Sequence, residues 1–97
     1  MNREKQVEKF NEFTDKMRSV ILSKSEDYAT ENDVLSNFKL AGAICGLTPE
    51  LNCLSLIATK VARLGVLLQG KVPNNESIQD SVLDLANYAV LLDMASS

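Results

Sequence analysis

The sequence predicts an all-α protein, a single domain over residues 1–97 built as a small four-helix bundle-like unit. Three observations predict this class. Apolar residues recur at intervals of three and four residues along most of the chain, which is the helical period. Residues that start and end helices interrupt that pattern at regular places. No stretch alternates apolar and polar residues between turn signals, as a strand would.

The first predicted helix runs from about Glu4 to Asp27, and its apolar stripe includes Val7, Phe10, Met17, Val20 and Ile21. A polar segment over 25–33 follows it. Its last two residues, Asn32-Asp33, are candidate N-caps for a shorter helix that ends at Cys45. Gly46 then has the residue type that commonly ends a helix. The sequence therefore predicts a long helix and a short one before residue 47.

The clearest helix start is the sequence Thr48-Pro49-Glu50. It supplies a capping hydroxyl, a proline suited to the first helical position and an acid for the positive end of the helix. The helix is expected to reach about Gln69, before the segment Gly70–Pro73. Ser77, with Asp80 three residues later, resembles a capping box for the last helix.

Apolar residues cover more of the last two helices than one buried stripe requires. In the third helix they occupy over half the circumference. The last helix, which runs to about Met94, carries one seam of Ile78, Val82, Leu85, Ala89 and Leu92 and a second of Leu83, Val90 and Met94. A chain of this size buries about one seam per helix, so the second seams predict a homo-oligomer, a dimer or tetramer, paired through apolar helix faces. The alternative is that the short helices wrap the third helix within one chain.

Charge and composition exclude several classes of function. The formal net charge is −3, whereas proteins that bind duplex nucleic acid need a clustered basic surface. No apolar run approaches the ~20 residues of a membrane span, and no secretory signal opens the chain, so we expect a cytoplasmic protein without membrane contact. The absence of histidine excludes Ser–His–Asp and Cys–His nucleophilic systems. Cys45 and Cys53 are expected to be small core residues.

An acidic strip marks the last helix. Glu76, Asp80 and Asp84 recur every four residues and, with Asn87, fall within about a quarter of the helix circumference. Like charges one turn apart repel, so a positive group facing the strip would stabilise it. The strip is therefore either a solvated face, a partner for cations of the protein, or part of a metal site.

Lys60 and Arg63 are the cations nearest in the chain order. They lie three residues apart on the most apolar helix, where a charge is costly unless it meets a carboxylate or a phosphate. One interpretation is an ion-pair network with Asp80 and Asp84 that locks the last two helices together. The other is that Lys60 or Arg63 holds a ligand phosphate.

A second polar cluster surrounds the turn between the first two helices. It contains a cation, a carboxylate, an amide and two aromatic rings, from Lys24, Asp27, Tyr28, Asn37 and Phe38. Purine recognition uses such groups: a ring for stacking, a carboxylate for the base edge and a cation for phosphate. Phe38 also fits the apolar stripe of its helix, so a core position is the alternative for that residue.

Four motifs occur in order over residues 20 to 92. They are Lys-x-x-Asp27-Tyr28, Asn-Phe38 before a helix of small residues, Lys60-Val-Ala-Arg63-Leu, and Glu76-Ser-Ile-x-Asp80-Ser-x-x-Asp84-Leu-Ala-Asn-Tyr88-Ala. Together they resemble the small all-α nucleotide-modification-associated domain family of phages. The resemblance implies a phage protein that acts on or binds nucleotides in the host bacterial cytoplasm. By type, the chain is also similar to small helical phage oligomers that act as sponges for cyclic oligonucleotide defence signals.

Two functions of different classes follow from these observations. The first is an anti-defence sponge that binds a cyclic dinucleotide, for example a guanine-containing one, without cleaving it and without a cofactor. Its ligand-binding residues would be Lys24, Asp27, Tyr28, Asn37, Phe38, Lys60, Arg63 and Asn87. The second is a Mg²⁺-dependent nucleotide pyrophosphohydrolase or nucleotide-modification enzyme, with Glu76, Asp80 and Asp84 as metal ligands. A structural or protein-interaction module is a third alternative.

The enzyme hypothesis meets one departure in the sequence. The all-α nucleotide pyrophosphatases, which this hypothesis resembles, commonly carry a second acidic pair of the form Glu-x-x-Glu on a partner helix. Here the nearest match is Glu8 and Glu12, which are four residues apart and lie far upstream. This departure favours the binding hypothesis over the enzyme hypothesis.

Overall fold

The computed structural model describes residues 1–28, 33, 35–70 and 77–97, and for residues 24–28 it describes the backbone alone. Within these ranges the chain forms four helices and no strand. They are α1 (Arg3–Tyr28), α2 (Ser36–Cys45), α3 (Pro49–Leu67) and α4 (Ile78–Ala95). The predicted all-α class is therefore confirmed for the described residues. The predicted bounds of α1, α3 and α4 agree with the observed ones to within two residues.

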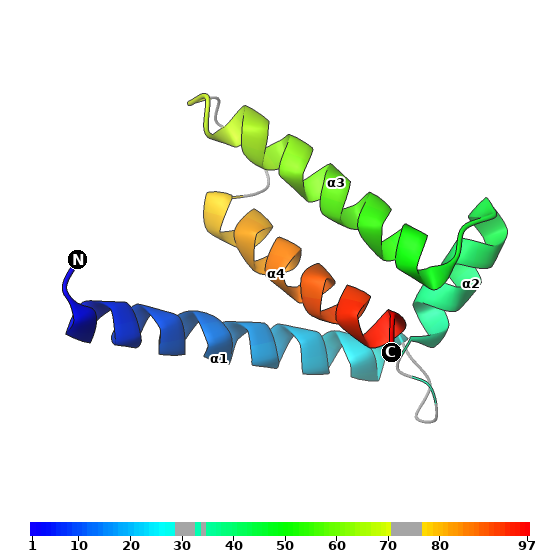
Figure 1. Ribbon diagram of the computed structural model, residues 1–97, viewed down its shortest axis with the longest axis horizontal. Helices are drawn as coiled ribbons and strands as arrows, with labels where there is room; N and C mark the ends of the chain where they lie inside the picture. Colours follow the sequence, from blue (N-terminus) through cyan, green and yellow to red (C-terminus); the bar gives the residue numbers. More distant parts are fainter. Residues whose placement is uncertain (29–32, 34, 71–76) are drawn as a thin grey trace.

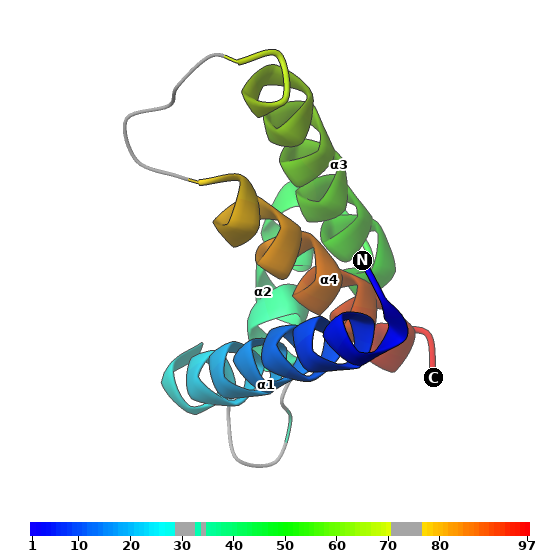
Figure 2. The ribbon, with the colours of Figure 1, turned by 90° about the vertical axis from the view of Figure 1, so that its left-hand side faces the viewer.

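The helices are arranged around α4. Helices α3 and α4 run antiparallel and share the most extensive packing in the chain, while α1 packs on another side of α4 (Figure 1). Seen from the end, α1 crosses beneath the α3–α4 pair rather than aligning with it (Figure 2). The short helix α2 packs on α3 at an angle of 87°. Helix α4 is thus the central element, with neighbours on two sides.

Three predicted helix boundaries are confirmed by their hydrogen bonds. The Thr48 hydroxyl accepts from the backbone N–H of Leu51 at 3.1 Å, and Pro49 occupies the first helical position of α3. Ser77 begins α4 with a complete capping box, because its hydroxyl accepts from the Asp80 N–H at 3.1 Å and the Asp80 carboxylate accepts from the Ser77 N–H at 3.4 Å. Gly46 ends α2 with φ of 72°, the left-handed region that glycine adopts without strain.

The start of α2 differs from the prediction. Leu35 occupies the N-cap position and contributes no side-chain hydrogen bond. Asp33, which was expected to cap the helix, instead accepts from the Leu35 N–H at 3.0 Å, two residues ahead. Its carboxylate also pairs with Lys39. Asp33 therefore organises the approach to α2 without being its cap, and the other candidate, Asn32, lies outside the described residues.

The connection from α2 to α3 depends on Gly42. Its carbonyl accepts from the Leu47 N–H at 2.6 Å, so the turn folds back against the last part of α2. A Cβ at position 42 would lie 2.6 Å from the Leu47 carbonyl oxygen, closer than real side chains approach. This close contact fixes the direction in which α3 leaves the turn.

The chain buries little of its apolar surface. Cys53 and Leu67 are the buried apolar side chains in the described ranges, whereas Leu54, Val61 and Leu68 are 51%, 54% and 71% exposed. Helix α2 covers one end of α3 only, so the alternative in which short helices wrap α3 within one chain is wrong. The exposed apolar face of α3 fits the predicted homo-oligomer, whereas Leu83 and Val90 of the second α4 seam are half-buried. The oligomer itself stays a prediction.

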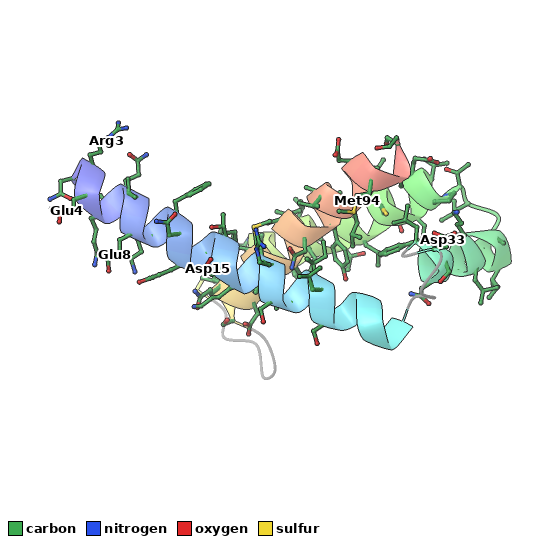
Figure 3. The ribbon with its side chains drawn as sticks, turned by 90° about the horizontal axis from the view of Figure 1, so that it is seen from below. Arg3, Glu4, Glu8, Asp15, Asp33 and Met94 are labelled. Atoms are coloured by element: carbon green, nitrogen blue, oxygen red, sulfur yellow. The ribbon has the colours of Figure 1, made fainter. Side chains whose placement is uncertain are left out.

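The shape is extended as well as poorly buried. The first turns of α1, with Arg3, Glu4 and Glu8, project beyond the other helices (Figure 3). Phe10 on the same helix is 66% exposed. The radius of gyration is 15.1 Å, compared with about 12.5 Å for a compact domain of this length. None of the four described helices is by itself long and apolar enough to cross a membrane.

Candidate functional site

The α3–α4 interface contains a largely buried ion pair. The Lys60 Nζ atom lies 3.0 Å from Asp84 Oδ2, and the two side chains are 12% and 22% exposed. Lys60 comes from the middle of α3 and Asp84 from the second turn of α4, so the pair joins the two helices across their shared face. The predicted pairing of Lys60 with the acidic strip is confirmed for Asp84.

The rest of the acidic strip is divided between other roles. Asp80 belongs to the capping box of α4 and is exposed. Its carboxylate therefore stabilises the start of the helix, where negative charge is favourable. Glu76 lies outside the described residues. Within the described residues, no group of three or more aspartate, glutamate or cysteine side chains is placed to hold a metal ion.

Asn87 is the most unusual polar side chain of α4. It is 5% exposed, and neither its Oδ1 nor its Nδ2 has a hydrogen-bond partner. It lies three residues after Asp84, on the strip that the sequence singled out. Leaving a buried donor or acceptor unpaired costs about 1–3 kcal/mol per group, so native proteins rarely do so without a reason. The Oδ1 atom can still accept a hydrogen bond from a group outside the chain, and the Nδ2 atom can still donate one to it.

Ser81 is a second buried polar residue, and no pattern in the sequence predicts its burial. Its side chain is fully buried, and its Oγ has no hydrogen-bond partner. A serine in a helix interior commonly bonds the carbonyl one turn earlier or faces solvent. Only its place between Asp80 and Val82, next to an apolar seam, distinguishes it in the sequence. Together Ser81 and Asn87 leave three unpaired polar atoms buried on α4.

Arg63 lies one turn after Lys60 on α3 and is exposed. Its side chain is in contact with solvent, whereas the Lys60 ammonium group is enclosed by the α3–α4 interface. Lys60 and Arg63, for which the sequence predicts the same two alternatives, therefore occupy different environments. Lys60 has a clear structural role through Asp84, and Arg63 is the better placed of the two to meet a phosphate in solution.

The predicted cluster at the first turn is only partly visible. The backbone of residues 24–28 belongs to α1, and the side chains of Lys24, Asp27 and Tyr28 lie outside the described part of the structure. Asn37 is exposed and Phe38 is half-buried on α2. The Asn52 side-chain amide of α3 donates a hydrogen bond of 3.4 Å to the Phe38 carbonyl oxygen. The role of this cluster in purine recognition stays a prediction.

A hollow of about 320 Å³ lies between α1 and α4. It is lined by one cation, one carboxylate, polar groups and apolar groups: Phe13, Lys16, Ser19, Val20, Gln79, Asp80 and Leu83. Sequence reasoning missed it because it depends on how α1 crosses α4, which no local pattern encodes. Asp80 is the one predicted site residue that it contains.

The two cysteines have different environments. Cys53 is fully buried, and burial, followed by the charge of Glu50, raises the pKa of its thiol. Cys45, for which a core position is predicted, is exposed. Both thiols are free. The prediction is confirmed for Cys53 and wrong for Cys45.

The structure thus joins Lys60 and Asp84 across the α3–α4 interface, buries the Asn87 amide on α4 and leaves Arg63 exposed on α3. A buried amide, a compensated charge pair and an exposed cation are groups that can bind an anionic polar ligand. Comparisons of the chain with protein families, with curated proteins and with solved structures found no match.

Proposed function

We propose that the chain is a phage anti-defence protein that binds and sequesters a cyclic dinucleotide in the host bacterial cytoplasm without cleaving it. The observation that supports this most directly is Asn87, whose buried amide has both hydrogen-bonding atoms unpaired. An amide reads the edge of a base through one accepted and one donated hydrogen bond. Binding would satisfy two atoms that the chain alone leaves unsatisfied.

Arg63 supplies the second element of the proposal. A cyclic dinucleotide carries two phosphodiester charges, and a guanidinium group forms charge-assisted hydrogen bonds with such oxygens. Arg63 is exposed on α3, close in the chain to the paired Lys60. The Tyr28 ring and the Lys24 and Asp27 side chains stay proposed contributors to base recognition, with stacking worth about 1–3 kcal/mol per base.

The binding hypothesis is preferred over the Mg²⁺-dependent enzyme because of how the acidic side chains are engaged. Asp84 forms an ion pair with Lys60, and Asp80 belongs to the capping box at the start of α4. Glu8, one of the two acids considered for a second metal-binding pair, forms an ion pair with Lys5 on the projecting end of α1 (Figure 3). Metal binding by the strip would therefore first have to break interactions that stabilise the fold.

The proposed protein is a homo-oligomer, a dimer or tetramer. Leu40 and Ile44 of α2 are 64% and 77% exposed, as are several apolar side chains of the other helices. Exposed apolar faces of this extent mark interaction surfaces in soluble proteins.

Substitution of Asn87 tests the proposed site. Asn87→Leu removes an unpaired buried amide, so it should leave the free energy of unfolding unchanged or increase it. The same substitution should weaken cyclic dinucleotide binding at least about 5-fold, which corresponds to the lower limit of about 1 kcal/mol for a lost base contact. Ser81→Ala is the matched control, since it also removes a buried unpaired group but lies one and a half turns away. Loss of stability with unchanged affinity would refute the assignment.

The fate of the ligand distinguishes sponge from enzyme. The purified protein is mixed with cyclic dinucleotides, or with nucleoside triphosphates and Mg²⁺, and the small molecules are analysed before and after heat denaturation. Intact cyclic dinucleotide released only by denaturation is the expected result. Product that accumulates with time would establish the enzyme alternative. Failure to bind any of these nucleotides would overturn the proposal and favour a structural module.

A further inference from the structure

Helix α3 presents a continuous apolar seam to solvent. The seam consists of Leu51, Leu54, Ala58, Val61, Gly65 and Leu68, which alternate at intervals of three and four residues. This is the a/d spacing by which two helices pack together along their length. All six residues are exposed, and the four large side chains are 50%, 51%, 54% and 71% exposed in chain order. We call this set the α3 seam.

The α3 seam is distinct from the face that packs on α4. Cys53, Lys60 and Leu67 mark the packed face, because the first and last are buried and Lys60 pairs with Asp84. At 100° per residue, the centre of the seam lies about 120° around the helix from them. At Gly65 an added Cβ would meet nothing within 4 Å. The seam is therefore uncovered in the single chain.

We infer that the α3 seam packs antiparallel against the same seam of a second copy of this chain. The twofold axis would pass between Ala58 and Val61. Leu54 then faces the partner's Gly65, Val61 faces the partner's Ala58, and Leu51 faces the partner's Leu68. Each large residue of the central layers meets a small one, which is how well-packed layers fill space. A parallel pairing would place glycine opposite glycine and alanine opposite alanine, and it would leave voids.

The charge pattern fits a second copy. Between Leu51 and Leu68, neither the seam nor its flanking positions 55, 57, 62 and 64 carry a charged residue. Two identical surfaces can therefore meet without opposing like charges. Gly65 also supports the close approach of a second helix. Glycine destabilises a helix interior, and a contact that requires the absence of a side chain accounts for its presence here.

The exposed area is sufficient for such a contact. The accessible surface of the chain is 7042 Å², compared with about 5,500 Å² for a compact monomer of 10.7 kDa. The excess of about 1,500 Å² exceeds the ~800 Å² that each partner buries in a standard stable interface. The exposed α3 seam contributes to this excess, as does the projecting end of α1.

This inference rests on the proposed homo-oligomer and names its contact, and a matched pair of variants tests it. Val61 on the seam is 54% exposed, and Val66 on the same helix but off the seam is 50% exposed. Val61→Glu should raise the dissociation constant for self-association at least about 100-fold, because it places unpaired charges at the interface centre. Val66→Glu should leave it unchanged. Molar mass is measured by light scattering over a concentration series, with helix content followed by circular dichroism.

The outcomes separate the inference from the proposed function. If the parent protein is monomeric at micromolar concentration, both the homo-oligomer and the α3 seam contact are wrong. If the parent assembles and Val61→Glu assembles equally well, only the seam is wrong. Cyclic dinucleotide binding is measured separately on each variant, so its loss or retention does not enter this decision.

Disulfide trapping tests the orientation in a Cys45→Ser background. Leu54→Cys and Gly65→Cys proteins, prepared separately and mixed under mild oxidation, should form a mixed disulfide dimer and little of either homodimer. Leu54→Cys that crosslinks efficiently with itself would indicate parallel pairing and would overturn the antiparallel arrangement. No crosslink in any mixture, from an assembled protein, would overturn the seam contact.

Discussion

The Lys60–Asp84 pair allows a quantitative test of what holds α3 to α4. Removing one partner of a fully buried ion pair costs about 3–5 kcal/mol, because the other charge stays buried and uncompensated. With side chains 12% and 22% exposed, this pair lies near that limit but retains some solvent screening. We expect Lys60→Met to lower the free energy of unfolding by about 2–3 kcal/mol. Urea unfolding followed by circular dichroism, at one fixed protein concentration, measures this change.

A double-mutant cycle isolates the pair from other effects of each substitution. Lys60→Met, Asp84→Asn and the double variant give a coupling energy that excludes contacts made by either residue alone. The matched control is Lys39 with Asp33, a second Lys–Asp pair whose side chains are 55% and 36% exposed. Exposed pairs contribute little, so the control cycle should give a much smaller coupling energy. Equal coupling energies in the two cycles would refute the argument from burial.

Three further predictions address other parts of the fold. Gly42→Ala should destabilise the chain, because the new Cβ would lie 2.6 Å from a backbone oxygen. The cost of this clash should exceed the ~1 kcal/mol by which alanine favours a helix over glycine. Thermal unfolding measures the change, and a stabilised variant would contradict the prediction. Cys45 should react rapidly with a thiol reagent in the native protein, and Cys53 only on unfolding, because Cys53 is buried and the pKa of its thiol is raised; equal rates would contradict this. The hydrogen bond from Lys39, followed by one from a backbone N–H, lowers the pKa of Asp33 below 3.8. The ionised Asp33 carboxylate therefore stabilises the fold above pH 3.8, and this contribution is lost as the pH falls through the lowered pKa of the folded state. Acid titration of Lys39→Met should therefore show this loss at higher pH than in the parent.

The features that the sequence could predict are those that depend on neighbouring residues. Thr48 and Ser77 cap their helices as expected because a hydroxyl needs only the N–H groups of the next turn. The Lys60–Asp84 pair was also predictable, since an ammonium group on an apolar helix requires a carboxylate and the next helix offered one. The chemistry of residue types was sufficient in these cases.

The features that could not be predicted depend on what covers each helix. Periodicity places Cys45 on the apolar side of α2, but it does not say whether another element packs there, and the side chain is exposed. The two oxygens of the Asp33 carboxylate accept from the Leu35 N–H and from Lys39, and this arrangement depends on the folded geometry around the start of α2. The hollow between α1 and α4 likewise arises from a crossing of helices that lie far apart in the chain. The burial of Ser81 follows from the same tertiary packing.

The position of α1 has a consequence for the order in which the chain folds. Helices α2 and α3 each contact the helix that follows them in the chain, whereas α1 packs mainly on α4, from which the other two helices separate it in sequence. Closing that large loop costs entropy before any contact compensates for it. The α2–α4 unit should therefore form first and α1 should dock last. In native-state hydrogen exchange, the amides of α1 would open at lower free energy than those of α3 and α4.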